Sequence, residues 1–331
     1  MRYMVADAIT NLYHVAMKIL KTAKRLVLAL FVSLTFSALP SLATPPEQAV
    51  GYWTEAAMKS AKPVSLLVDP KTGLGTLSVE PLATDTIGAE WTEGGLSQSA
   101  NGKVFFSIGR SNYVCSGSVV QDVSTDVSIV VTAAHCVMDK GRFVTNWAFV
   151  PNYDSGNRTF WYASNLVVRT EFASQRQFNR TAIEHDWAFA VIPEGTFTKN
   201  KVIYPNPSSQ LDALGAFVYS ENGFSSGSLS TAFGYPADGK YDGKTLKYAQ
   251  GIIANDPNGY TTWGMPSDLT GGASGGPWLS NLSSGLVSSV NSYKYTNDAL
   301  RMYGPKFGVK TTATFNAAKA ATGSTDVIVR N

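Results

Sequence analysis

Short apolar runs separated by turn residues constrain the fold of this chain more than any other feature. They recur irregularly between residues 101 and 331, with turn signals such as Asn222-Gly223 and Asp242-Gly243 between them. This pattern favours an all-β sandwich or barrel over alternating strands and helices. The expected strands are Val104–Ile108, Val114–Val120, Val127–Thr132, Trp147–Val150, Leu166–Val168, Trp187–Ile192, Tyr248–Ile253, Trp278–Leu279 and Leu286–Val290.

Two regions depart from the β pattern. An Ala-rich stretch at Thr312–Ala321, followed by Gly323, predicts one helix near the C-terminus. Residues 44–100 form a separate acidic unit, in which Thr54 is expected to cap a short helix that ends before Pro63. Two interpretations of this unit stay open: an extension packed on the main domain, residues 101–331, or a removable pro-segment.

Residues 1–43 resemble a secretory signal peptide. A basic stretch from Lys18 to Arg25 precedes an apolar run, Leu26–Leu39, and small residues end at Ala43. The run is too short to span a bilayer comfortably, so we expect export rather than a stable membrane anchor. Translation is expected to start at Met17, where an ordinary signal begins. Of the net charge of +3, this leader carries +4, and the near-neutral remainder argues against nucleic acid as a partner.

The chain has three histidines, which limits any imidazole chemistry. His14 would leave with the signal, and His185 is expected to be a solvated or packing residue, so His135 is the credible base. A Gly-rich turn around Ser274 would expose a nucleophilic hydroxyl and aim backbone N–H groups at one point. Gly272-x-Ser274-x-Gly276 also fits the nucleophile elbow of α/β-hydrolases, but that fold needs a histidine after the serine, and none follows His185.

His135 lies just beyond an apolar strand and beside Cys136. Cys115 is the only available partner for Cys136, and an even cysteine pair in an exported protein favours a disulfide. A Cys136 thiol nucleophile is less favoured, because neighbouring side chains at a strand end point apart. A zinc site is poorly supported, because the mature chain would keep only two histidines and has no His-Glu-x-x-His pattern. We therefore expect no metal or other cofactor. Asp186, at the start of another apolar strand, could orient an imidazole.

Three blocks in this order, Thr132–Cys136, Asp186–Ala188 and Gly272–Pro277, resemble the catalytic blocks of chymotrypsin/trypsin-like serine proteases. The resemblance covers roughly residues 101–320 and is nearest to the secreted microbial branch that includes glutamyl endopeptidases. It implies two six-stranded antiparallel β-barrels, with the short C-terminal helix, and a site in the cleft between them. Cys115–Val120 resembles the strand whose cysteine pairs with the one after the histidine.

The resemblance also implies roles for individual residues. Ser274 would be the nucleophile, His135 the general base and Asp186 the residue that holds the imidazole tautomer. The N–H groups of Gly272 and Ser274 would form the oxyanion hole. Substrate backbone would pair with the edge at Ser288–Tyr293, which makes Ser292 and Tyr293 substrate-binding candidates.

Specificity is only partly indicated. Asp268 stands where trypsins keep the Asp that selects Arg or Lys, although it could instead be a turn residue. Glutamyl endopeptidases use a pocket histidine after the serine, which this chain lacks. Ala273 replaces the Asp that pairs with the freed N-terminus of many members, so that activation switch is not expected.

The sequence therefore predicts a secreted, monomeric serine endopeptidase that acts on polypeptides. Two alternatives stay open: a protease-like binding or adhesion module that has lost activity, and an esterase on the same fold.

Overall fold

The computed structural model describes residues 46–78, 88–122, 126–154 and 159–330, except for the side chains of residues 46 and 47. The expected signal peptide, residues 1–43 with a start at Met17, lies outside these residues. The helices are α2 (Pro46–Ala49), α3 (Glu55–Ser60), α4 (Gly95–Ala100), η1 (Ala134–Cys136), α5 (Thr170–Ala173), α6 (Arg180–Glu184), α7 (Ser208–Ala213) and α8 (Val309–Lys319).

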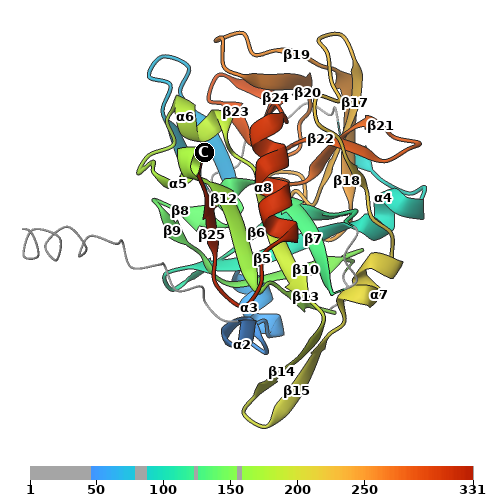
Figure 1. The fold of residues 1–331 in the computed structure, drawn as a ribbon. Coiled ribbons are helices and arrows are strands. Elements are labelled where there is room, and N and C mark those ends of the chain that lie inside the picture. The colour runs from blue at the N-terminus through green and yellow to red at the C-terminus, as the bar shows by residue number, and fades with distance from the viewer. Residues whose placement is uncertain (1–45, 79–87, 123–125, 155–158, 331) are drawn as a thin grey trace, which may run out of the picture. The chain divides into compact units, whose positions relative to one another are not determined.

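The first half of the β structure is a nine-stranded sheet in the order β11-β10-β5-β6-β7-β13-β12-β25, with β1 paired to β6 (Figure 1). Its strands are β1 (Lys62–Pro63), β5 (Asn101–Ile108), β6 (Ser111–Val120), β7 (Val127–Thr132), β10 (Thr145–Pro151), β11 (Trp161–Tyr162), β12 (Asn165–Arg169), β13 (Ala188–Pro193) and β25 (Val327–Val329).

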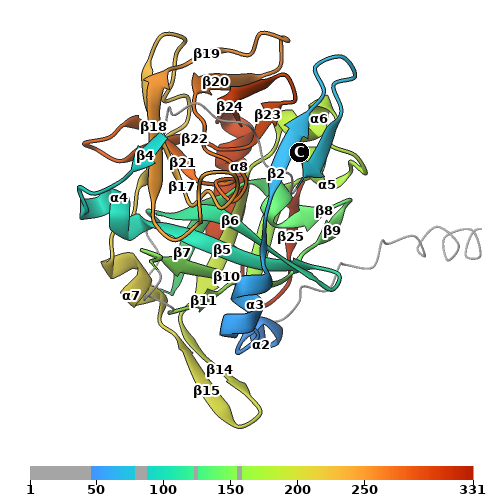
Figure 2. The same cartoon turned by 180° about the vertical axis from the view of Figure 1, so that it is seen from behind.

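The second half holds two six-stranded sheets, β16-β22-β21-β17-β18-β4 and β19-β20-β24-β23-β2-β3. Their strands are β2 (Ser65–Val68), β3 (Gly75–Ser78), β4 (Gly88–Glu90), β16 (Val218–Tyr219), β17 (Leu229–Gly234), β18 (Lys247–Ile252), β19 (Ala254–Asn255), β20 (Thr262–Pro266), β21 (Pro277–Asn281), β22 (Leu286–Val290), β23 (Tyr293–Tyr295) and β24 (Asp298–Pro305). Two separate hairpins are β8 (Met138–Asp139) with β9 (Arg142–Phe143), and β14 (Gly195–Lys199) with β15 (Val202–Asn206), which projects from the body (Figure 2).

The all-β prediction is confirmed, but two six-stranded barrels are not. Short strands from outside the expected set lengthen the sheets: β1 and β25 join the first, and β2, β3 and β4 join the others. All nine expected strands are present, with bounds that differ by a few residues at most. The predicted C-terminal helix is α8, and Thr54 caps α3 by accepting a hydrogen bond from the Ala57 N–H at 3.2 Å.

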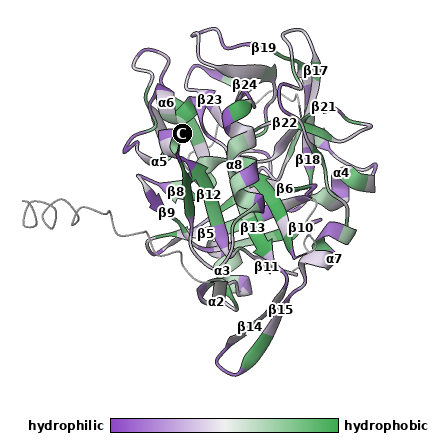
Figure 3. Ribbon diagram, viewed as in Figure 1, coloured by the Kyte–Doolittle hydropathy of each residue, from purple (hydrophilic) through white to green (hydrophobic). Residues whose placement is uncertain are grey.

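The central strands are largely apolar because both of their faces are buried. In β7, Val130 packs in the core of the first half, whereas Ile129 and Val131 face a second core shared with α8. β13 alternates in the same way, which follows from the two-residue period of a strand. Figure 3 shows β13 and the middle of β12 as hydrophobic ribbons. These rigid strands end at the residues that form the candidate site.

Candidate active site

The turn that carries Ser274 lies between β20 and β21, and its shape depends on glycine. Gly272 and Gly275 have φ of +93° and +83°, a region that favours glycine. A Cβ on Gly275 would also lie 2.1 Å from Thr132 Oγ1 and 2.4 Å from the Ser116 carbonyl. The Ser116 N–H donates to the Ser274 carbonyl at 2.7 Å, which ties the turn to β6.

His135 lies on η1, directly after β7, and is fully buried. The predicted disulfide is present between Cys136 and Cys115 and joins this turn to β6. The His135 main-chain N–H donates to Asp186 Oδ1 at 2.9 Å, so backbone and side chain meet the same carboxylate. The turn that carries the imidazole is therefore tied both to β6 and to Asp186.

Asp186 precedes β13 and is buried beneath the imidazole. Its Oδ2 lies 2.7 Å from His135 Nδ1 and accepts a hydrogen bond from the Ser292 hydroxyl at 2.6 Å. A carboxylate at Nδ1 favours the tautomer in which Nε2 carries no proton. Nε2 is buried and, among the described residues, has no hydrogen-bond partner. It is thus available to accept a proton.

The Ser274 hydroxyl is turned toward a different atom. It donates to the main-chain carbonyl of Val64 at 3.2 Å, and the Gly272 N–H donates to the same oxygen at 3.0 Å. The structure thus brings the serine turn close to Cys136, the neighbour of His135, and His135 to Asp186, while the serine hydroxyl bonds a carbonyl of residues 44–100. Sequence reasoning missed Val64 because nothing in that segment resembles a known motif.

His185 is a packing residue, as expected. Its ring lies 5.2 Å from the Trp187 ring, and its Nδ1 is 2.9 Å from the Thr181 carbonyl. Burial lowers the pKa of His185. It takes no part in the cluster around Asp186.

Of the three residues expected to bind substrate, Ser292 and Tyr293 lie together and Asp268 lies elsewhere. Ser292 and Tyr293 border a small cavity beside Ser274, together with Leu269, Thr270 and Met302. Asp268 does not line this cavity: its carboxylate lies 2.6 Å from Lys240 Nζ and accepts a hydrogen bond from the Tyr241 hydroxyl at 2.6 Å. Lys294 does border it, and burial lowers the pKa of this lysine to about 7.

Asn291 supports the serine turn and was not predicted. Its Nδ2 donates to the carbonyls of Ala273 and Phe233, and its N–H and carbonyl bond Gly276 and Gly275. Its position directly before Ser292 was the only available signal. Ala273 is fully buried, and its Cα lies 2.9 Å from where a Gly234 Cβ would be.

Two findings bear on metals and membranes. Within the described residues, Cys115, His135 and Cys136 have the spacing of a three-ligand group, but both sulfurs are used in the disulfide and offer no thiolate. None of the helices in the described part of the chain has both the length and the apolar character to cross a bilayer.

Comparison with known proteins identifies the family. The chain is similar to the thermostable serine protease AL20 from an extremophilic microorganism, with 35% identity, a TM-score of 0.58, and coverage of 69% of this chain and 100% of that one. It is also similar to the protease Anisep from Arthrobacter nicotinovorans, with 37% identity, a TM-score of 0.57, and coverage of 67% and 96%. A Glu endopeptidase in complex with MPD shares the fold at 16% identity, with a TM-score of 0.52 and coverage of 72% and 98%.

No protein-family model and no curated protein matches the chain. The fold is that of the chymotrypsin-type proteases. The chain belongs to the serine proteases of this fold, as the resemblance of its three blocks indicated.

Proposed function

We propose that this chain is a secreted serine endopeptidase that uses Ser274, His135 and Asp186. One observation carries the proposal: the buried contact of 2.7 Å between His135 Nδ1 and Asp186 Oδ2, next to a turn whose Gly272 N–H already binds a carbonyl oxygen. A buried carboxylate at Nδ1 is what a histidine base needs, and a donor aimed at a carbonyl is what an acyl-transfer site needs.

The chemistry follows from these groups. Ser274 Oγ attacks the carbonyl carbon of the scissile bond while His135 Nε2 accepts the hydroxyl proton. The N–H groups of Gly272 and Ser274 stabilise the oxyanion. His135 then donates the proton to the leaving amine, and an acyl-enzyme ester on Ser274 remains. Water, deprotonated by His135, releases the acid and restores the serine.

A fluorophosphonate probe tests this proposal, because it phosphonylates only an activated serine. We expect label on Ser274 by peptide mapping, no label in Ser274→Ala, and label as in the wild type in the control Ser128→Ala, which removes a buried hydroxyl of β7. A well-folded protein that stays unlabelled even when Val64 is displaced from Ser274 would instead support the inactive binding module. Peptide and ester substrates of the same side chain separate a peptidase from an esterase.

Export and processing need a second measurement. We propose that residues 1–43 are removed and that residues 44–100 precede the protease domain. Mass analysis of the protein in the culture medium is expected to give an N-terminus at or beyond Thr44. A secreted chain that begins at Met1 or Met17 would contradict the proposed signal.

A further inference from the structure

The segment Lys62–Val68 runs through the active site. β1 pairs in parallel with β6, with Lys62 opposite Tyr113, and the Val64 N–H donates to the Val114 carbonyl at 3.3 Å. β2 then pairs in parallel with β23, with Leu66 opposite Tyr293. A single stretch of chain therefore bridges the strand that carries Cys115 and the strand that follows Ser292.

At the middle of this stretch, Val64 engages the reactive groups. Its carbonyl oxygen accepts hydrogen bonds from the Gly272 N–H at 3.0 Å and from the Ser274 hydroxyl at 3.2 Å. These are the two groups that would bind and attack the carbonyl of a substrate. While Val64 is in place, a substrate carbonyl has no access to them.

The segment also seals the site from solvent. Val64 and Val68 are at most 1% exposed, and Leu66 packs among Tyr293, Tyr303 and Ile183. Beneath the segment, Ser274 retains 5% of its surface. An edge strand completed in this way is the usual mode of peptide docking on a sheet.

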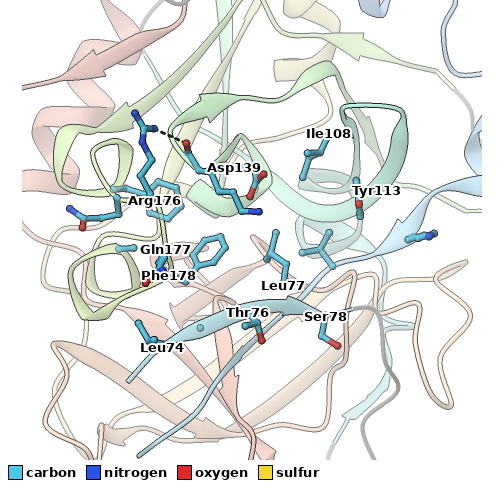
Figure 4. A pocket seen from close by; sticks show the side chains of 17 residues that line it. Leu74, Thr76, Leu77, Ser78, Ile108, Tyr113, Asp139, Arg176, Gln177 and Phe178 are labelled. Carbon is cyan, nitrogen blue, oxygen red and sulfur yellow. Dashed lines mark hydrogen bonds between the residues drawn. The ribbon is translucent and has the colours of Figure 1, made fainter. Parts of the chain in front are cut away.

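The β2–β3 hairpin extends this cover toward His135. The Gly75 N–H donates to the Phe178 carbonyl at 2.5 Å, and the Phe178 ring lies 6.3 Å from the His135 ring. A cavity of about 720 Å³ adjoins this contact. Figure 4 shows hairpin residues Thr76 and Leu77 on one side of it, with Phe178 beside Leu77. The hairpin thus lines this cavity together with Phe178.

The direction of the segment differs from that of a cleavable peptide. When Ser274 attacks a carbonyl, the side chain of that same residue belongs in the specificity pocket beside the serine. Val64 instead packs in the core of the first half, and the cavity beside Ser274 is bordered by Ser65, Leu66 and Leu67. Residues that should leave with the amine therefore occupy the acyl side of the site.

We propose that Lys62–Val68 is a built-in inhibitor of this protease, docked with its chain direction reversed so that it fills the oxyanion site without being cut. The proposal rests on the proposed function and adds its regulation. It assigns residues 44–100 to an inhibitory role rather than to passive packing, and activity then requires the segment to leave the cleft.

Leu66→Asp tests the inhibition, because it places a carboxylate among buried tyrosines. We expect fluorophosphonate labelling of Ser274 in the full chain to become at least 10-fold faster than in the wild type. Lys71→Asp, in the exposed turn of the same hairpin, is the control and should label at the wild-type rate. Circular dichroism checks that the fold persists. Equal rates in folded wild type and Leu66→Asp would overturn the inhibitory role.

A synthetic peptide of residues 60–70 tests the direction. Added to the Leu66→Asp chain, it is expected to slow labelling and to remain intact while a reference peptide is turned over. Cleavage between Val64 and Ser65 would overturn the reversed docking.

Binding of the fluorescent peptide to the Leu66→Asp, Ser274→Ala double variant gives a readout independent of catalysis. Binding without any label in Leu66→Asp would overturn the protease function while leaving the docking intact, and absence of binding would overturn the docking itself.

Discussion

The hydroxyl of Ser292 donates to Asp186 Oδ2 at 2.6 Å, the same oxygen that faces His135 Nδ1. The segment that borders the cavity beside Ser274 and the carboxylate that contacts the imidazole are therefore one hydrogen-bonded unit. Ser292 was expected to bind substrate, and the geometry adds a contact that helps to hold the Asp186 carboxylate against the imidazole.

Ser292→Ala is expected to lower kcat/KM on a peptide substrate roughly 10- to 150-fold, since a hydrogen bond to a charged acceptor contributes about 1.5–3 kcal/mol. Ser128→Ala is the matched control, because Ser128 is equally buried but its hydroxyl donates to the Ser208 carbonyl, away from Asp186. An unchanged kcat/KM in Ser292→Ala would show that the other contacts are sufficient to position Asp186 without Ser292.

Gly275→Ala is expected to prevent formation of the serine turn. The φ of +83° costs a non-glycine residue about 1–2 kcal/mol, and the added Cβ would collide with the backbone of β6. Gly259→Ala has a similar φ of +74° but open space around its Cβ, so it isolates the backbone cost. Urea unfolding should show a loss of about 1 kcal/mol for Gly259→Ala and a markedly larger one for Gly275→Ala, with no labelling of Ser274. Equal losses would contradict the steric argument.

Removal of the disulfide is expected to destabilise the chain by about 3 kcal/mol, because the bond closes a loop of 21 residues in the unfolded state. The Cys115→Ala, Cys136→Ala double variant should unfold at lower urea than the wild type. Dithiothreitol should lower the urea midpoint of the wild type toward that of the variant, and it should leave the midpoint of the variant unchanged. A variant as stable as the oxidised wild type would refute this prediction.

Asp326 predicts a pH dependence of stability. One carboxylate oxygen accepts from the Leu166 N–H at 2.8 Å, the other is buried without a described partner, and burial raises the pKa to about 7. The unfolded value is about 3.9, so the folded state holds the extra proton between these values. The stabilisation that comes from protonated Asp326 is complete below about pH 4, and it is lost as the pH rises through about 7.

Asp326→Asn should therefore be more stable than the wild type at pH 8, by about 2 kcal/mol, and should lose this advantage at pH 4. The pKa of Asp242 is lowered by its hydrogen bond to Lys244, so Asp242→Asn serves as a control with the opposite sign and a smaller size. Parallel pH profiles of Asp326→Asn and the wild type would rule out the raised pKa.

Much of the first half was predictable because its strands are buried on both faces and read as apolar runs. β20, β23 and β24 were missed, since their sequences mix Gly, Tyr, Arg and Lys, whose burial depends on distant partners. Tyr293 and Tyr295, for example, are buried because their hydroxyls bond Asp256. That pairing has no local signature.

The three catalytic candidates could be found because chemistry restricts which residue types can serve. The environment of Asp268 was harder to predict. Its carboxylate accepts a hydrogen bond from the ammonium of Lys240, which lies 28 positions away in sequence. Its role in selecting substrate stays a prediction. The contact of Val64 with Ser274 could not be predicted. It is made by a main-chain carbonyl, which every residue type has, so the side chain at position 64 gives no signal of it.

The pairing of β25 with β12 joins Val327 to Val167, and Asn165 reaches Thr325 across 160 positions of sequence. A ribosome adds residues at about 5–20 per second, so β25 is synthesised roughly ten to thirty seconds after β12. The sheet whose ends hold His135 and Asp186 is completed only after β25 has been made. Synthesis itself thus delays assembly of the first sheet until most of the chain exists.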